Sequence, residues 1–173
     1  MVKIEYNGEI YTRSNSKWAD SRHHIVHDSL QNFLNQQYLK TLDYSKYSVD
    51  ELVAEGDKLK ESSSYSSAIH FYEKALEECD ETTYKYILPR ITSCYRKSNM
   101  PRKVIDLFAD TKSLYGTSFI TPVLLTSVAA AYCDLKEYEN ALRCCRWAYK
   151  TYGKFDPNLS NVWSRIKKES GLE

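Results

Sequence analysis

The sequence predicts a mostly α-helical protein in which pairs of antiparallel helices stack into an α-α superhelix, behind a small N-terminal β-hairpin and helix. Three observations lead to this prediction. Apolar residues recur at spacings of three and four through most of the chain. Glycine and proline are scarce, with 5 and 4 residues, and mostly fall where turns are expected. Small residues open a helix repeatedly, at Ala68, Val104 and Ala141, at intervals of 36 and 37 residues.

The start of the chain predicts a β-hairpin. Val2, Ile4 and Tyr6 alternate with polar residues, which is the period of a half-buried strand. Asn7-Gly8 then offers the two positive-φ positions that a tight hairpin turn needs. Because two strands alone are only marginally stable, we expect the hairpin to pack on another element.

A connecting loop, one helix and a linker are predicted next. Residues 14–22, around Trp18, are expected to form the loop. The helix should begin near Asp28 or Ser29, since either side chain can cap it. Its apolar stripe comprises Leu30, Phe33, Leu34 and Tyr38. Residues 44–48 are polar and rich in tyrosine, which indicates a linker, so we place a domain boundary between residues 1–48 and residues 49–173.

From residue 49 onward the pattern is helix, short turn, helix, and it repeats. Each segment has the length of an ordinary helix. The expected segments are 50–61, 66–78, 83–97, 102–114, 122–135 and 138–152. Pro89 falls within the third of them and would kink that helix or mark its true start. A last helix is expected after Asp156-Pro157, as a C-terminal cap.

Three copies of one residue pattern align between residues 49 and 153. The first copy has Leu52, Gly56, Leu59, Tyr65, Ala68, Tyr72 and Ala75 at its key positions, and the third has Leu125, Val128, Ala129, Tyr132, Tyr138, Ala141, Cys145 and Ala148. This order of large, small and aromatic positions resembles the tetratricopeptide repeat (TPR) family, whose period is ~34 residues. The resemblance implies stacked helical hairpins, in which small residues let helix axes approach closely.

In TPR proteins the first helix of each pair lines a concave groove that holds a peptide or a partner helix. The resemblance therefore implies a partner-binding groove here, lined by Asp57, Lys60, Tyr86, Arg90, Ser93, Lys97, Thr126, Ser127, Ala130 and Asp134. A charge between apolar walls could recognise a peptide end or a charged side chain. One variant of the family clamps a C-terminal carboxylate, but Asp57 would repel such a group. The alternative interpretation is that these are solvated positions on helix surfaces.

Metal and catalytic signatures are weak or missing in the sequence. His23 and His27 would share a helix face with Asp28 beside them, which could suggest zinc, but they precede the expected helix cap and no second ligand cluster accompanies them. The sequence has no G-x-S-x-G motif, no phosphate-binding glycine loop and no dinucleotide fingerprint. We therefore expect no metal, no cofactor and no enzymatic activity.

Composition and charge limit the cellular location and the kinds of partner that we expect for this protein. No apolar stretch approaches the ~20 residues that cross a bilayer, and the N-terminus shows no signal core, so a cytoplasmic protein is expected. Five cysteines without CxxC spacing argue against a disulfide framework. The net charge of +1 gives no general attraction to polyanions or membranes.

The function predicted from the sequence is a non-catalytic protein–protein or protein–peptide interaction module. Two alternatives stay open. The first is a peptide-sensing regulatory accessory protein. The second is a nucleic-acid-associated protein that uses local basic patches, such as the one around Arg96, Lys97 and Arg102. The N-terminal extension could pack on the first helical pair, fill the groove, or mediate homo-oligomer formation through its strand edges.

Overall fold

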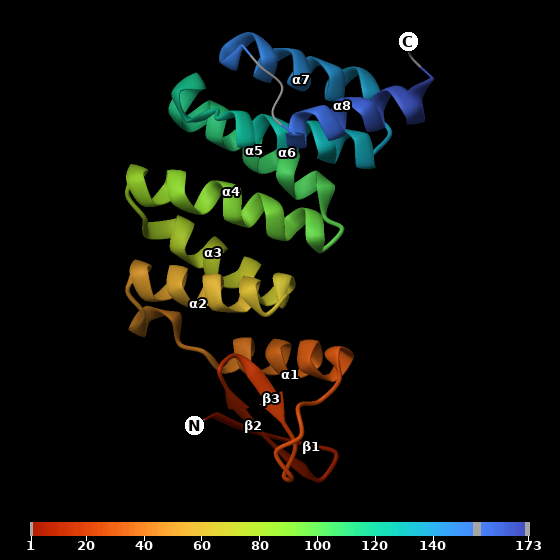
Figure 1. Cartoon of the computed structure of the whole chain (residues 1–173). Coiled ribbons are helices and arrows are strands. Elements are labelled where there is room, and N and C mark those ends of the chain that lie inside the picture. Colours follow the sequence, from red (N-terminus) through yellow and green to blue (C-terminus); the bar gives the residue numbers. More distant parts are fainter. Residues whose placement is uncertain (1, 154–156, 172–173) are drawn as a thin grey trace. The chain divides into compact units, whose positions relative to one another are not determined.

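The structure is a computed structural model of the chain that describes residues 2–153 and 157–171. It is mostly helical, as predicted, with eight α-helices and one three-stranded antiparallel sheet in the described residues (Figure 1). The chain divides into two compact units, residues 1–87 and 88–173, and the division falls inside helix α4. The two units are described separately below.

The first unit begins with strands β1 (Val2–Tyr6), β2 (Glu9–Ser14) and β3 (Lys17–Ala19), which pair in that order. The predicted hairpin is confirmed, and Asn7 and Gly8 take positive φ values of 53° and 77° at its turn. The third strand was not predicted, because residues 14–22 were expected to form a loop. Asn15 and Ser16 also adopt positive φ, which makes a second tight turn possible without glycine.

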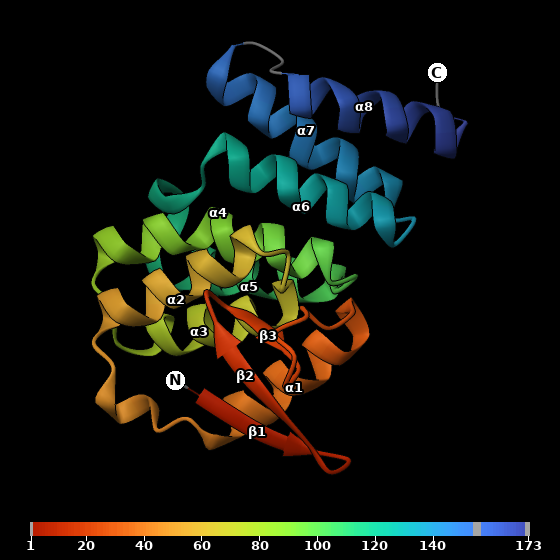
Figure 2. The ribbon, with the colours of Figure 1, turned by 60° about the horizontal axis from the view of Figure 1, so that its bottom comes forward.

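Helix α1 (Asp28–Thr41) covers one face of the sheet, as Figures 1 and 2 show. Its cap is His27, whose ring nitrogen accepts a hydrogen bond from the N–H of Leu30 at 3.4 Å. The prediction that Asp28 or Ser29 caps the helix is therefore wrong. Those two residues form the first turn, where the Asp28 carboxylate still complements the helix dipole.

A small core joins the sheet to α1. Tyr11, Trp18 and Leu34 are buried together, and partly buried apolar residues pack around them. Those residues are Val2, Ile4, Tyr6, Val26, Leu30 and Tyr38. The alternation predicted for the first strand is thus used to bury one face of the sheet under the helix.

Trp18 is fixed by α1 through both its backbone and its side chain. Its backbone N–H donates to the Gln31 side-chain oxygen at 2.8 Å, and the Gln31 amide donates back to the Trp18 carbonyl at 2.7 Å. The indole N–H donates to Asn35 Oδ1 at 2.8 Å. Gln31 therefore satisfies backbone groups of β3 together with Val26, whose N–H also donates to the Trp18 carbonyl at 3.1 Å.

Helices α2 (Val49–Glu61) and α3 (Tyr65–Glu78) form the first antiparallel pair. Ser48 caps α2 and forms a reciprocal capping box with Glu51. The predicted close approach of the two helices occurs at Gly56. A Cβ atom at that position would lie 2.7 Å from Cε1 of Tyr72, whose ring is fully buried. Only glycine leaves room for this ring.

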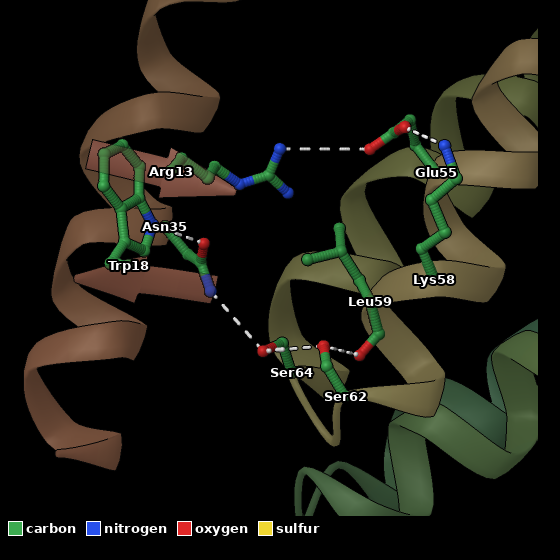
Figure 3. Close-up of polar contacts among 8 residues, drawn as sticks. All are labelled: Arg13, Trp18, Asn35, Glu55, Lys58, Leu59, Ser62 and Ser64. Carbon is green, nitrogen blue, oxygen red and sulfur yellow. Dashed lines mark hydrogen bonds and ion pairs between the residues drawn. The ribbon is translucent and has the colours of Figure 1, made fainter. Parts of the chain in front are cut away.

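The N-terminal elements pack on the first pair, which is one of the three roles considered for them. Figure 3 shows the polar part of this junction: Arg13 faces Glu55 at 3.9 Å, and Asn35 donates to the Ser64 hydroxyl at 3.5 Å. The rings of Tyr44 and Tyr47 contact Phe71 of α3, with centroid distances of 5.8 and 6.4 Å. Residues 44–48 are therefore a packed connection, and Tyr44 opens a short 3-10 turn (η1, Tyr44–Lys46).

Helix α4 (Glu81–Lys97) starts close to the predicted residue and contains Pro89 in its interior. The proline therefore does not mark the start of the helix. It has no N–H to donate to the carbonyl one turn earlier. Thr92, one turn later, donates its hydroxyl to the carbonyl of Leu88 at 2.9 Å.

The second unit continues with helices α5 (Pro101–Tyr115), α6 (Pro122–Asp134), α7 (Tyr138–Tyr152) and α8 (Pro157–Ser170), and a 3-10 turn η2 (Gly116–Phe119) lies between α5 and α6. These bounds agree with the predicted segments to within one residue. Helices α6 and α7 form an antiparallel pair, and α8 packs against both of them. Arg165 of α8 fixes this contact by an ion pair to Asp134 at 2.5 Å.

In the described residues no helix is both long and apolar enough to cross a membrane. The five cysteines form no disulfide, and all except the half-buried Cys79 are buried. Burial raises the pKa of Cys144 to about 11 and that of Cys145 to about 12. These thiols stay protonated at neutral pH, which suits a role as small apolar groups in the core.

Candidate functional site

The candidate site is a pocket of about 420 Å³ between α2 and the first turns of α4, within the first unit. Helix α2 lines it with Asp50, Val53, Ala54 and Asp57, and α4 lines it with Thr82, Thr83 and Tyr86. The α2 residues are spaced at three, four and seven positions, so they form one stripe along the helix. This stripe lies beside the one that packs on α3 through Gly56.

The start of α4 is held by Asp80. Its carboxylate accepts a hydrogen bond from the N–H of Thr83 at 2.7 Å, and its carbonyl accepts one from the N–H of Tyr84 at 2.8 Å. The hydrogen bond to Thr83 also lowers the pKa of Asp80 below its ordinary value. This cap places Thr82 and Thr83 at the pocket edge and fixes the direction in which Tyr86 leaves the helix.

Asp57 connects the three helices around the pocket. One carboxylate oxygen accepts from the Tyr72 hydroxyl of α3 at 2.6 Å, and the other accepts from the Tyr86 hydroxyl of α4 at 3.0 Å. Tyr72 is fully buried, whereas Tyr86 is 44% exposed. Asp57 thus tethers the tip of an exposed aromatic ring, so this ring is presented in one orientation.

The chemistry of the pocket follows from these contacts. Val53 provides a buried apolar floor, and the face of Tyr86 provides an exposed aromatic wall. Asp50 adds a second carboxylate at the edge, and no basic side chain is among the described residues that line the pocket. Such a pocket suits an apolar side chain that has a neutral or basic group next to it, and it disfavours a carboxylate.

The structure brings together two of the predicted groove residues in the first unit. Asp57 and Tyr86 line the pocket, but half-buried Lys60 does not. Asp50, Ala54, Thr82 and Thr83 also line the pocket and were not among the predicted groove residues. Helical spacing from Asp57 could have predicted Asp50 and Ala54, which lie on the same face of α2. The positions of Thr82 and Thr83 could not be predicted in this way, because they depend on where α4 begins.

The remaining predicted groove residues belong to the second unit. Arg90 and Ser93 are half-buried on α4, and Lys97 is exposed near its end. Ser127 is half-buried on α6. Asp134 forms ion pairs with Arg165, as above, and with Arg96 at 4.0 Å.

The side chains of Thr126 and Ala130, on α6, are buried. Thr126 is 8% exposed and Ala130 is 1% exposed. This differs from the groove expected on α6. Helix α6 packs against three neighbours, α5, α7 and α8, which leaves little of its surface open.

Thr126 gives a direct test of this burial. Its hydroxyl oxygen is buried and makes no hydrogen bond to the described residues. We expect Thr126→Val to raise the free energy of unfolding by about 1 kcal/mol, because it removes an unpaired buried polar group. Urea denaturation followed by circular dichroism measures this change.

Thr111 offers the matched control, since it is also a buried helical threonine. Its hydroxyl donates to the carbonyl of Leu107 at 2.6 Å, so Thr111→Val should bring no gain in stability. A Thr126→Val protein less stable than the wild type would show that the hydroxyl has a favourable partner.

The histidines do not form the arrangement that suggested zinc. His23 lies in a turn with φ of 65°, and His27 is the extended cap of α1, so the two do not share a helix face. No group of three or more histidine, cysteine, aspartate or glutamate side chains in the described part of the chain could hold a metal ion.

Comparison of the chain with protein families, with curated proteins and with solved structures finds no match.

Proposed function

We propose that this protein is a non-catalytic interaction module built from TPR-like helical pairs, which binds a peptide segment of a partner protein. The single observation that carries the proposal is the pocket between α2 and α4. It combines an apolar floor at Val53 with a tethered, exposed ring at Tyr86. In the proposed superhelix these two helices are the first members of successive pairs, and the resemblance to the TPR family implies a binding groove along such helices.

The electrostatics of the pocket narrow the choice of peptide. Asp50 and Asp57 give the pocket a negative lining. A peptide that inserts an apolar side chain and carries lysine or arginine beside it would therefore be favoured over one that ends in a carboxylate. A cytoplasmic location agrees with this role and remains part of the proposal.

Selection of phage-displayed random peptides on the purified protein tests the proposal without a known partner. We expect the selected peptides to share an apolar residue next to a basic one. We expect Tyr86→Ala to weaken their binding by at least about ten-fold, because aromatic side chains that become buried in an interface contribute much of the binding energy. Fluorescence polarisation with the synthesised peptides measures the dissociation constants.

Tyr149→Ala is the matched control. Tyr149 is 46% exposed on α7, close to the 44% of Tyr86, and it lies in the other unit. Its removal should leave binding of the selected peptides unchanged. The proposal fails if the selected peptides bind the Tyr86→Ala and wild-type proteins equally well, or if no peptide is selected.

A further inference from the structure

The outer face of the N-terminal sheet is a second surface, distant in sequence from the pocket at α2 and α4. Lys3 pairs directly with Thr12, Thr12 with Ala19, and Ala19 forms an isolated bridge with Ile25. Directly opposed residues in neighbouring antiparallel strands point to the same face. These four side chains therefore form one row across the sheet, on the face opposite the Trp18 core.

A cavity of about 740 Å³ lies over this row. Basic residues Lys3, Lys17 and His23 are among its lining, and all three are exposed. Ala19 and Ile25 supply its apolar part, and the Ile25 side chain is 63% exposed. The row thus runs from a basic end at Lys3 to an apolar end at Ala19 and Ile25, and Lys17 and His23 lie near the apolar end in sequence.

The turn that carries His23 is well ordered by hydrogen bonds. The carboxylate of Asp20 accepts from the backbone N–H groups of Arg22 and His24, both at 2.9 Å. The N–H of His23 itself donates to the Asp20 carbonyl at 3.0 Å. These bonds, that from His24 first, lower the pKa of Asp20. The turn therefore holds His23 beside the sheet. The Asp20 carboxylate is already engaged by backbone N–H groups of the same turn.

The balance of charge on this face is positive. No aspartate or glutamate lines the cavity within the described residues. The closest acidic residue along the same face of β1 is Glu5, two positions beyond Lys3. Arg13 also contributes to the lining, but its guanidinium group is directed to the opposite side, over the ring of Tyr38 at 4.5 Å and toward Glu55.

We propose that this basic sheet face binds an acidic peptide segment of a partner protein, with an aliphatic side chain of that segment placed on Ile25 and Ala19. Charge complementarity selects the acidic groups, and the exposed isoleucine selects the apolar one. RNA fits less well, because single-stranded RNA binds through aromatic side chains that stack on bases. Among the described residues that line this cavity, His23 carries the sole ring, and no phenylalanine, tyrosine or tryptophan is present.

The test uses a fluorescein-labelled peptide in which a pair of leucines is flanked on both sides by pairs of glutamates. Fluorescence polarisation should show binding to the full-length protein that weakens as salt is raised. The double variant Lys3→Glu and Lys17→Glu should weaken binding by at least about ten-fold, because two attractions become repulsions. A peptide with glutamine in place of glutamate should bind the wild-type protein as weakly as the acidic peptide binds the double variant.

The matched control is the double variant Lys167→Glu and Lys168→Glu, which changes the net charge equally at two exposed positions on α8. It should bind the acidic peptide within about two-fold of the wild type. Both double variants should keep wild-type circular dichroism spectra, since the four lysines are exposed.

Four outcomes would overturn the proposal. They are equal binding by the two double variants, equal binding of the glutamine peptide, tighter binding of polyuridine RNA than of the acidic peptide, and no binding to the wild type at millimolar peptide. Sedimentation velocity tests a fifth outcome, in which this face binds a second copy of the chain. If the protein self-associates through this face and the Lys3→Glu and Lys17→Glu variant is monomeric, the occupant is a second copy and the proposed partner is wrong.

Discussion

Replacement of Trp18 by alanine is expected to lower the free energy of unfolding by about 3–5 kcal/mol, the largest effect of any single change considered for this protein. The indole ring is fully buried between the sheet and α1. Its loss leaves a cavity in a small core and also leaves the Asn35 oxygen without its donor. Urea denaturation followed by far-ultraviolet circular dichroism measures the change.

Two further variants separate the causes of this effect. Trp18→Phe keeps most of the ring but not the N–H group, so it should cost only about 1–3 kcal/mol, mainly from the unpaired Asn35. Trp147→Ala is the control, since Trp147 is half-buried in the second unit, and its cost should be smaller. An unchanged unfolding midpoint for Trp18→Ala would contradict the packing of the sheet on α1.

Hydrogen exchange shows which part of the chain loses stability in the Trp18→Ala protein. Trp18→Ala should increase amide exchange in residues 2–41, whose packing depends on the indole, and leave exchange in α6 and α7 unchanged. Uniformly faster exchange in both units would instead show that the N-terminal core stabilises the whole chain.

Replacement of Gly56 by alanine is expected to lower the free energy of unfolding by about 2 kcal/mol. Alanine normally stabilises a helix interior by up to ~1 kcal/mol relative to glycine, so this sign is opposite to the intrinsic propensity. The reason is the distance of 2.7 Å between the new Cβ and Tyr72 Cε1. The Tyr72 ring cannot easily move away, because it is fully buried and its hydroxyl donates to Asp57.

A double-mutant cycle with Tyr72→Leu is the control for this clash. Tyr72→Leu alone should be destabilising, but the added cost of Gly56→Ala should disappear or reverse in that background, giving a coupling energy of at least about 1 kcal/mol. Thermal unfolding of the four proteins by calorimetry measures it. A Gly56→Ala protein more stable than the wild type would show that α2 and α3 do not depend on this contact.

Gly56→Ala should also alter the proposed binding pocket. Displacement of Tyr72 would disturb Asp57, and through Asp57 the hydroxyl of Tyr86. Asp57 therefore links the interior of the first pair to the pocket surface, which is why a position first expected to contact a partner also contributes to the fold.

Most of the secondary structure could be predicted from the sequence, because it depends on local periodicity and turn chemistry. The strand alternation of Val2, Ile4 and Tyr6, the Asn7-Gly8 turn and the helical spacing after residue 49 each specify an element within a few residues. The need for a small residue at Gly56 is also local, since the pattern of large and small positions repeats along the chain. Asp57 and Tyr86 were expected to face a partner because of the resemblance to the TPR family, and both line the pocket.

Tertiary structure alone decided the rest. Strand β3 exists because Trp18 is buried against α1 and because Gln31 satisfies its backbone, and both partners come from a helix that begins ten residues later. Thr126 and Ala130 are buried on α6, which packs against α5, α7 and α8, and α8 begins only at Pro157. Such contacts join segments whose proximity no local pattern encodes. The sequence by itself therefore determined which residues form helices and strands, while long-range packing determined which of their faces remain open to a partner.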